Sequence, residues 1–393
     1  KAQHRDDYSE LLSFYNYTLE ATARDKNELD SVIYKANAGI LVHDLRNSWI
    51  DNLYMLMGQA YYFRNELDTA YLTFQYVNYA FAPKEEDGYD IPIGSNAVEG
   101  GNAFTISTKE NNSLAHKVWT TPPSRNESFI WQIRTFLAKK EMAEAAGLIE
   151  TLKHDPQFPE RLHSDLHEVT ALYFYQLETY DSAAHYLEKA LDNAADREER
   201  ARWEYLIGQL YERSRKHEQA EAFFLRTVKH TLNPVLEVYA RLNAIRQHKG
   251  DNKVIDQNIA DLVKMARKDR YTNYRDIIYY MAAQMELERN NIAGARHFLL
   301  LATKAIGDGT ANISKSKAFL ELAELSFNEK DYREAKRFYD SVNLSDLPLT
   351  QATSIEVRKN VLAKIAQQLE VIYRQDSLQR IAALPEAERE AFI

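Results

Sequence analysis

The sequence predicts an all-α fold built from repeated helix–turn–helix units, with one irregular insertion. Amphipathic segments of about 12–16 residues, joined by short breaks, follow one another along most of the chain. Glycine and proline interrupt helices, and the 393 residues include only 12 and 9 of them. Eight of these 21 fall between Pro83 and Pro123. The helical segments also share a recurring order of small and bulky residues, which indicates stacked repeats.

Each clear repeat has a small residue, an alanine twelve positions later, a bulky residue four further on and a small or medium residue three beyond that. Small residues let the two helices of a repeat approach closely, while the bulky one fills the space against the next repeat. This spacing is the tetratricopeptide-repeat pattern and predicts a right-handed superhelix. The sets are Gly58/Ala70/Phe74/Val77, Ala171/Ala183/Leu187/Ala190, Gly208/Ala220/Phe224/Thr227, Ala283/Ala295/Leu299/Ala302 and Ala323/Ala335/Tyr339/Val342.

The repeats divide the chain into four parts. We expect N-terminal capping helices and the first clear repeat in 1–83, the insertion in 84–125, the repeat array in 126–348, and a C-terminal helix with the start of a truncated extension in 349–393. The helix should run from about Ala352 to Tyr373. Within the array, clear units lie near 164–197, 201–234, 276–309 and 316–348, and degenerate units near 126–160 and 238–275.

The insertion is long for a connection between repeat helices, which usually has about 2–8 residues. Its apolar anchors argue for an ordered surface element with a binding role, with an inert cover over a helix edge as the other reading. Ile91–Ile93 and Phe104–Ile106 could pair as a short hairpin. The insertion residues that we expect to contact a partner are Tyr89, Ile91, Phe104 and Trp119.

Composition excludes several functional classes. The net charge of −9 argues against nucleic-acid binding, which needs clustered basic residues. The absence of cysteine excludes disulfides, thiol catalysis and cysteine-bound metals. His163 and His167 share a helix face, but Ser-Asp-Leu between them breaks the zinc-protease pattern. The sequence contains no phosphate-binding loop and no nucleophile motif with the residue spacing that these motifs require, so we expect neither catalysis nor a cofactor.

The face of the array most suited to recognition is the concave one. In such repeats it is lined by the first helix of each pair, and exposed Tyr and Gln side chains there favour binding of a peptide or protein; the other reading packs them between repeats. The residues that we assign to this face are Met55, Gln59, Tyr62, Tyr175, Tyr205, Gln209, Glu212, Tyr280, Gln284, Leu320, Glu324 and Phe327.

Several short motifs are more specific than the repeats. They lie in and beside the insertion and after the last repeat: Ala80–Tyr89 (AFAPKEEDGY), Ile93–Asn96, Ser107–Glu110, Pro123–Asn126, Trp131–Arg134 and Gln375–Ala382 with Leu384-Pro385-Glu386. In these motifs, and over essentially its whole length, the chain resembles the PorW/SprE family, tetratricopeptide lipoproteins of the type IX secretion and gliding machinery of Bacteroidota.

The resemblance implies a non-enzymatic scaffold on the periplasmic face of the outer membrane. It would link the periplasmic PorK/PorN ring to the outer-membrane translocon and serve secretion and gliding. The resemblance also implies a lipid-attachment cysteine, which we expect upstream of Lys1. Two alternatives remain open: a glycan-binding outer-membrane lipoprotein of SusD type, and a cytosolic tetratricopeptide regulatory domain.

Overall fold

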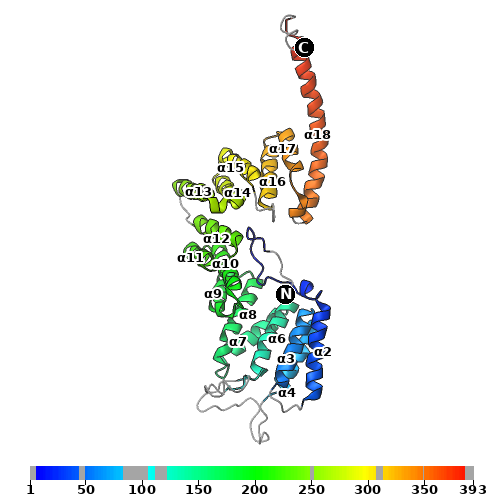
Figure 1. Ribbon diagram of the computed structural model, residues 1–393, viewed down its shortest axis with the longest axis vertical. Coiled ribbons are helices and arrows are strands. Elements are labelled where there is room, and N and C mark those ends of the chain that lie inside the picture. Colours follow the sequence, from blue (N-terminus) through cyan, green and yellow to red (C-terminus); the bar gives the residue numbers. More distant parts are fainter. Residues whose placement is uncertain are drawn as a thin grey trace. The chain divides into compact units, whose positions relative to one another are not determined.

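The computed structural model describes residues 6–43, 49–82, 105–110, 122–247, 252–306, 313–347 and 349–385. All regular structure within these ranges is helical, and the helices pack in consecutive pairs, as a helical-repeat fold requires. The prediction of an all-α repeat fold is therefore confirmed. The chain divides into two compact units, residues 1–247 and 248–393 (Figure 1).

Unit 1 contains most of the helix pairs. From α2 to α12 each helix packs against its neighbour in the chain. In addition, α1 and α6 both contact α3, and α6 contacts α8, so that the first helices of these successive pairs lie beside each other. The helices are α1 (Leu19–Thr22), α2 (Lys26–Val42), α3 (Ile50–Phe63), α4 (Leu67–Ala80), α6 (Arg125–Lys139), α7 (Met142–Lys153), α8 (His163–Gln176), α9 (Tyr180–Lys189), α10 (Arg197–Arg213), α11 (His217–His230) and α12 (Pro234–Arg246).

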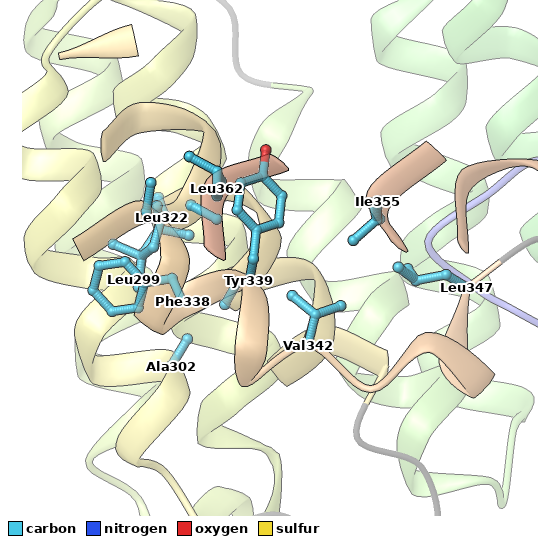
Figure 2. Packing of buried hydrophobic residues seen from close by; sticks show 13 residues of the cluster. Leu299, Ala302, Leu322, Phe338, Tyr339, Val342, Leu347, Ile355 and Leu362 are labelled. Atoms are coloured by element: carbon cyan, nitrogen blue, oxygen red, sulfur yellow. The ribbon is translucent and has the colours of Figure 1, made fainter. Parts of the chain in front are cut away.

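Among its described residues, unit 2 has one helix that packs on the first of two further pairs, then those two pairs and a long final helix. Its helices are α13 (Asn252–Ala266), α14 (Arg275–Glu288), α15 (Ile292–Lys304), α16 (Ile313–Asn328), α17 (Tyr332–Asp340) and α18 (Leu349–Ala382). The first turns of α18 close the core: Ile355 and Leu362 are buried in one cluster with Leu299, Leu322 and Tyr339 (Figure 2). Residues 371–380 of α18 are exposed, so the helix extends past the core that it completes.

The predicted repeat positions form the core of both units. All twenty residues of the five predicted sets are buried. Phe74 packs so closely on Gly58, and Phe224 on Gly208, that a Cβ atom on either glycine would lie within 3 Å of the ring. The small residues therefore do what the pattern requires, which is to admit a bulky side chain of the partner helix.

The turns inside the pairs share one backbone geometry. Among the described residues, six that are not glycine have positive φ, and each lies between the two helices of a pair: Asn65, Lys140, Glu178, Arg215, Asn290 and Lys330. The residue after each donates its N–H to a carbonyl five positions earlier, as Lys216 does to Tyr211 at 2.9 Å. This is the capping arrangement that glycine usually serves. Asparagine, lysine, glutamate or arginine stands at these six positions, so the scarcity of glycine in the sequence gave no indication of these capping turns.

The structure adds detail at the two ends of the chain. In the region assigned to the N-terminal capping helices, residues 6–18 form no helix, and α1 and α2 follow them in the described part of 1–48. The C-terminal helix is longer than expected: it continues from Tyr373 to Ala382.

Candidate functional site

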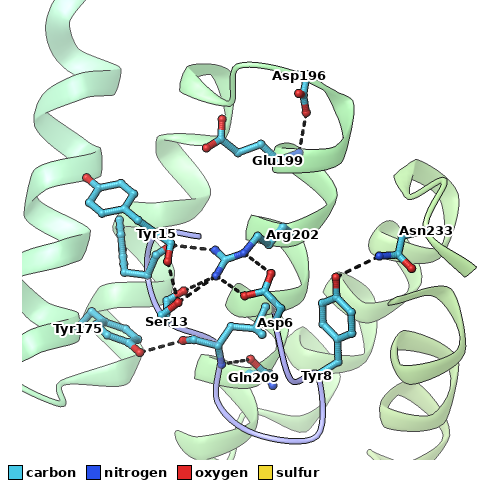
Figure 3. Close-up of polar contacts among 12 residues, drawn as sticks. Asp6, Tyr8, Ser13, Tyr15, Tyr175, Asp196, Glu199, Arg202, Gln209 and Asn233 are labelled. Atoms are coloured by element: carbon cyan, nitrogen blue, oxygen red, sulfur yellow. Dashed lines mark hydrogen bonds and ion pairs between the residues drawn. The ribbon is translucent and has the colours of Figure 1, made fainter. Parts of the chain in front are cut away.

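A non-helical stretch at the start of the chain contacts helices far along the sequence. We call residues 6–17 the N-terminal segment. It lies against α8, α10 and the start of α12, where Figure 3 shows it turning back on itself. The side chains that receive it form the docking face, defined here as Arg134, Glu168, Tyr175, Arg202, Tyr205, Gln209 and Asn233.

The docking face binds mainly the backbone of the segment. Tyr205 Oη donates to the carbonyl of Tyr8 at 2.6 Å, and Tyr175 Oη donates to the carbonyl of Leu12 at 2.8 Å. The Gln209 amide makes two bonds: Nε2 donates to the carbonyl of Glu10 at 2.6 Å, while Oε1 accepts the N–H of Leu12 at 3.0 Å. Such bonds recognise a chain conformation more than a side-chain sequence.

Arg202 joins the two ends of the turn. Its Nε and Nη2 donate to the two carboxylate oxygens of Asp6 at 2.7 and 3.0 Å. Nη1 and Nη2 also donate to the carbonyls of Phe14 and Ser13 at 2.9 and 2.7 Å. The Arg202 and Asp6 side chains are only 7% and 10% exposed, so removing one would leave the other charged group buried without its partner.

Apolar and aromatic side chains of the segment fill the space between these bonds. Leu12 and Phe14 are 2% and 3% exposed. The ring of Phe14 packs edge-on against Tyr175, with centroids 5.7 Å apart. Tyr8 packs edge-on against Tyr205 at 5.8 Å, and burial together with the nearby Asp6 carboxylate raises its pKa to about 12. The hydroxyl of Tyr8 therefore stays protonated at neutral pH.

The segment ends on a buried polar network. Tyr15 Oη donates to Glu168 Oε1 at 2.8 Å, and the same oxygen accepts a bond from Arg134 Nη2 at 2.8 Å. Asn193 Nδ2 donates to the other carboxylate oxygen of Glu168 at 2.9 Å. Burial raises the pKa of Tyr15 well above its ordinary value. Glu168 is thus paired with a cation and with two neutral donors, as a buried carboxylate requires.

Part of the insertion, residues 105–110, is tied to the ends of α6 and α7. The carboxylate of Asp155 accepts bonds from the N–H groups of Ile106 and Ser107 at 2.9 and 2.8 Å and from the hydroxyl of Thr105. Burial would raise the pKa of Asp155, but the hydrogen bonds from Thr105 and Ser107, with one from the Gln157 N–H, hold this pKa below its ordinary value. This stretch is a fixed anchor of the insertion.

The residues assigned to the concave face divide into three groups. Met55 and Tyr62, at 3% and 4% exposure, lie in the core around Phe74, as in the alternative reading that packs such side chains between repeats. Tyr205 and Gln209 are also buried, at 0% and 7%, but the N-terminal segment contributes to their cover. The others are half-buried: Gln59, Tyr175, Glu212, Tyr280, Gln284, Leu320, Glu324 and Phe327.

Some of the residues assigned to the concave face lie together in the structure, and the others do not. Tyr175, Tyr205 and Gln209 meet at the docking face, and Glu212 lies one turn further along α10, where it accepts a bond from Gln247 Nε2 at 2.9 Å. Tyr280, Gln284 and Phe327 belong to unit 2. The insertion residues Tyr89, Ile91, Phe104 and Trp119 lie outside the described residues, and of the hairpin suggested for Ile91–Ile93 and Phe104–Ile106 only Thr105 and Ile106 lie within them.

Sequence reasoning missed Asp6, Tyr8, Leu12 and Phe14, which supply the other half of the contacts. It also missed Arg202, a charged residue of α10. The only local signal for the segment is the alternation of apolar and polar residues from Leu12 to Tyr15, which favours an extended chain with one buried side.

The described residues contain no cluster of three or more histidine, aspartate or glutamate side chains that could hold a metal ion. Their helices include none that is long and apolar enough to cross a membrane. No protein-family model matches the chain, and a search of curated proteins finds no match.

Proposed function

We propose that the chain is a non-enzymatic scaffold that binds other proteins through its helical repeats. The observation that carries this proposal is the docking face, where side chains from two successive first helices, α8 and α10, bond to the backbone of a non-helical polypeptide segment. The peptide groups that these side chains bind occur in every protein. A face that holds one such segment therefore has the chemistry to hold a segment of another protein.

The tetratricopeptide type of the repeats and the cellular role are the finer parts of the proposal. The motifs in and beside the insertion support a place in the type IX secretion system, as a lipid-anchored component at the periplasmic face of the outer membrane. There the chain would connect the PorK/PorN ring to the translocon. The fixed anchor at residues 105–110 supports a second interaction surface at the insertion, held at a set distance from the docking face because both are built on unit 1.

A capture experiment tests this proposal. The chain is immobilised and exposed to detergent-solubilised cell envelope, beside an unrelated acidic helical-repeat protein of similar size as the control bait. We expect ring or translocon proteins to be enriched on the chain and not on the control. Folding of the bait is checked by circular dichroism. If the folded chain retains no envelope protein above the control, the proposal is refuted, and a glycan-binding screen becomes the next experiment.

A further inference from the structure

The N-terminal segment contacts the repeats as a bound peptide would. Its internal hydrogen bonds are local: Glu10 N–H to the Asp7 carbonyl, Ser9 to the Asp7 carboxylate, and Ser13 Oγ to the Tyr15 carbonyl. The bonds that hold it in place go to residues more than 150 positions away. The segment therefore takes its conformation from the docking face, and no helix of the array depends on it for its own backbone bonds.

The docking face binds the backbone of the segment and also selects particular side chains. Main-chain bonds fix the path of the segment, and three features set which side chains fit. Arg202 selects a carboxylate at position 6, the space between α8 and α10 takes the apolar side chains of Leu12 and Phe14, and Glu168 accepts the hydroxyl of Tyr15. The pattern is an acid, a tyrosine two residues later, and Leu-x-Phe-Tyr beginning six residues after the acid.

We propose that the N-terminal segment is an exchangeable ligand within the chain, and that the docking face receives in its place a segment of a partner protein with this acid–tyrosine–Leu-x-Phe-Tyr pattern. The proposal rests on the scaffold function proposed above and names the partner chemistry for one of its surfaces. We infer the pattern of the partner segment from the N-terminal segment that the docking face already binds, because a segment with the same groups can make the same hydrogen bonds.

Because the chain's own N-terminal segment occupies the docking face, a partner segment must exceed a minimum affinity to displace it. A segment joined to its site by a short connection competes at an effective concentration on the order of millimolar. A partner segment of equal intrinsic affinity therefore binds the intact chain weakly, and its apparent affinity falls in proportion to the fraction of chains with an open face. A partner binds well only if it fits the face better or if the N-terminal segment is held elsewhere.

The test measures exchange in the full chain. The probe is a fluorescein-labelled synthetic peptide of residues 6–17, followed by fluorescence anisotropy. The open variant is the full chain with Asp6→Asn and Phe14→Ala, which weakens its own segment and leaves the docking face intact. We expect this variant to bind the probe at least roughly tenfold more tightly than the unaltered chain, as the competition predicts. A peptide carrying the same two substitutions is the matched control and should bind neither chain.

Two further variants keep the test decisive. Leu12→Asp opens the face by a different route, because it places a charge where the side chain is 2% exposed. Adding Arg202→Ala to the open variant should abolish probe binding, since it removes the partner of the probe's Asp6. If neither open variant binds the probe while both remain helical by circular dichroism, exchange is refuted. Binding that survives Arg202→Ala also refutes it, because the peptide then binds elsewhere.

This result is separate from the scaffold function. If the capture experiment retains ring or translocon proteins but the open variants bind no probe, the exchange proposal fails and the scaffold stands. If the probe binds as expected but no envelope protein is captured, the docking face is a peptide site and the envelope role fails.

Discussion

Gly208→Ala tests whether the small residues of the repeat pattern are required by close helix packing. A Cβ atom at this position of α10 would lie 2.7 Å from Cδ1 and Cε1 of Phe224 on α11. Ordinary carbon–carbon contacts are about 3.5–4.0 Å, so the ring must move by roughly 1 Å. Phe224 is fully buried, and its ring lies 5.3 Å from that of Tyr205, which blocks one direction of movement.

The expected loss follows from two opposing effects. Overpacking a rigid core costs about 1–3 kcal/mol, and replacing glycine by alanine inside a helix returns up to about 1 kcal/mol. The net change is a loss of roughly 1–2 kcal/mol in the free energy of unfolding. For a unit of this size, that corresponds to a melting temperature lower by roughly 2–8 °C.

Gly147→Ala is the matched control. Gly147 also lies inside a helix, α7, but a Cβ atom there would meet nothing within 4 Å. We expect this variant to gain up to about 1 kcal/mol, because only helix propensity changes. Thermal melts followed by far-UV circular dichroism compare the two. Equal or higher stability of Gly208→Ala than of Gly147→Ala would refute the packing argument. A double variant with Phe224→Leu should recover part of the loss.

Three other variants test the turns, the docking face and the insertion anchor. Arg215→Gly should stabilise unit 1 by up to about 1 kcal/mol, because φ is +60° there and glycine adopts it without strain; a lower melting temperature would contradict this. Tyr205→Phe should cost about 1–3 kcal/mol by stranding the Tyr8 carbonyl and the Asn243 amide, whereas Tyr211→Phe, whose hydroxyl makes only a long 3.4 Å bond, should cost less in the same melts. Asp155→Ala should speed amide hydrogen exchange of Ile106 and Ser107 roughly tenfold at neutral pH, since each loses its acceptor. In the unaltered chain the same protection should disappear only as the pH falls below the usual titration range of an aspartate, because the folded pKa of Asp155 is lowered and its stabilising charge is present above that pKa. Protection that persists at lower pH would refute the role of the carboxylate.

The repeat core could be predicted because its determinants are local and periodic. The spacing of Gly208, Ala220 and Phe224 within one helix pair is a property of neighbouring residues, and burial of the corresponding positions in all five pairs confirms it. The capping turns could not be predicted in the same way. Arg215 adopts positive φ because the helices on both sides impose it, and its side chain gives no local reason for this conformation.

The candidate site could be predicted only in part. Tyr175, Tyr205 and Gln209 follow from the register of the first helices, which faces them to one side. The partner of that face could not be found from sequence, because nearly 200 residues separate Leu12 from Gln209. The path of Asp6–Phe14 depends on bonds from Arg202, Gln209 and the tyrosines of α8 and α10, which are all far away in the sequence. Tyr205 is buried for this reason, as in the alternative reading that packs these side chains.

The N-terminal segment also changes how unit 1 should respond to force. In a simple repeat array each repeat touches only its neighbours, so the array can lengthen and lose repeats one after another. Here the N-terminal segment crosses α8, α10 and the start of α12 and is hydrogen-bonded to each of them. It therefore connects three helices that belong to three successive repeats. Tension applied at residue 6 acts first on the bonds of Arg202. We expect the N-terminal segment to detach from the docking face before any helix unfolds. Unit 1 should then extend under a smaller force than it does with the segment bound.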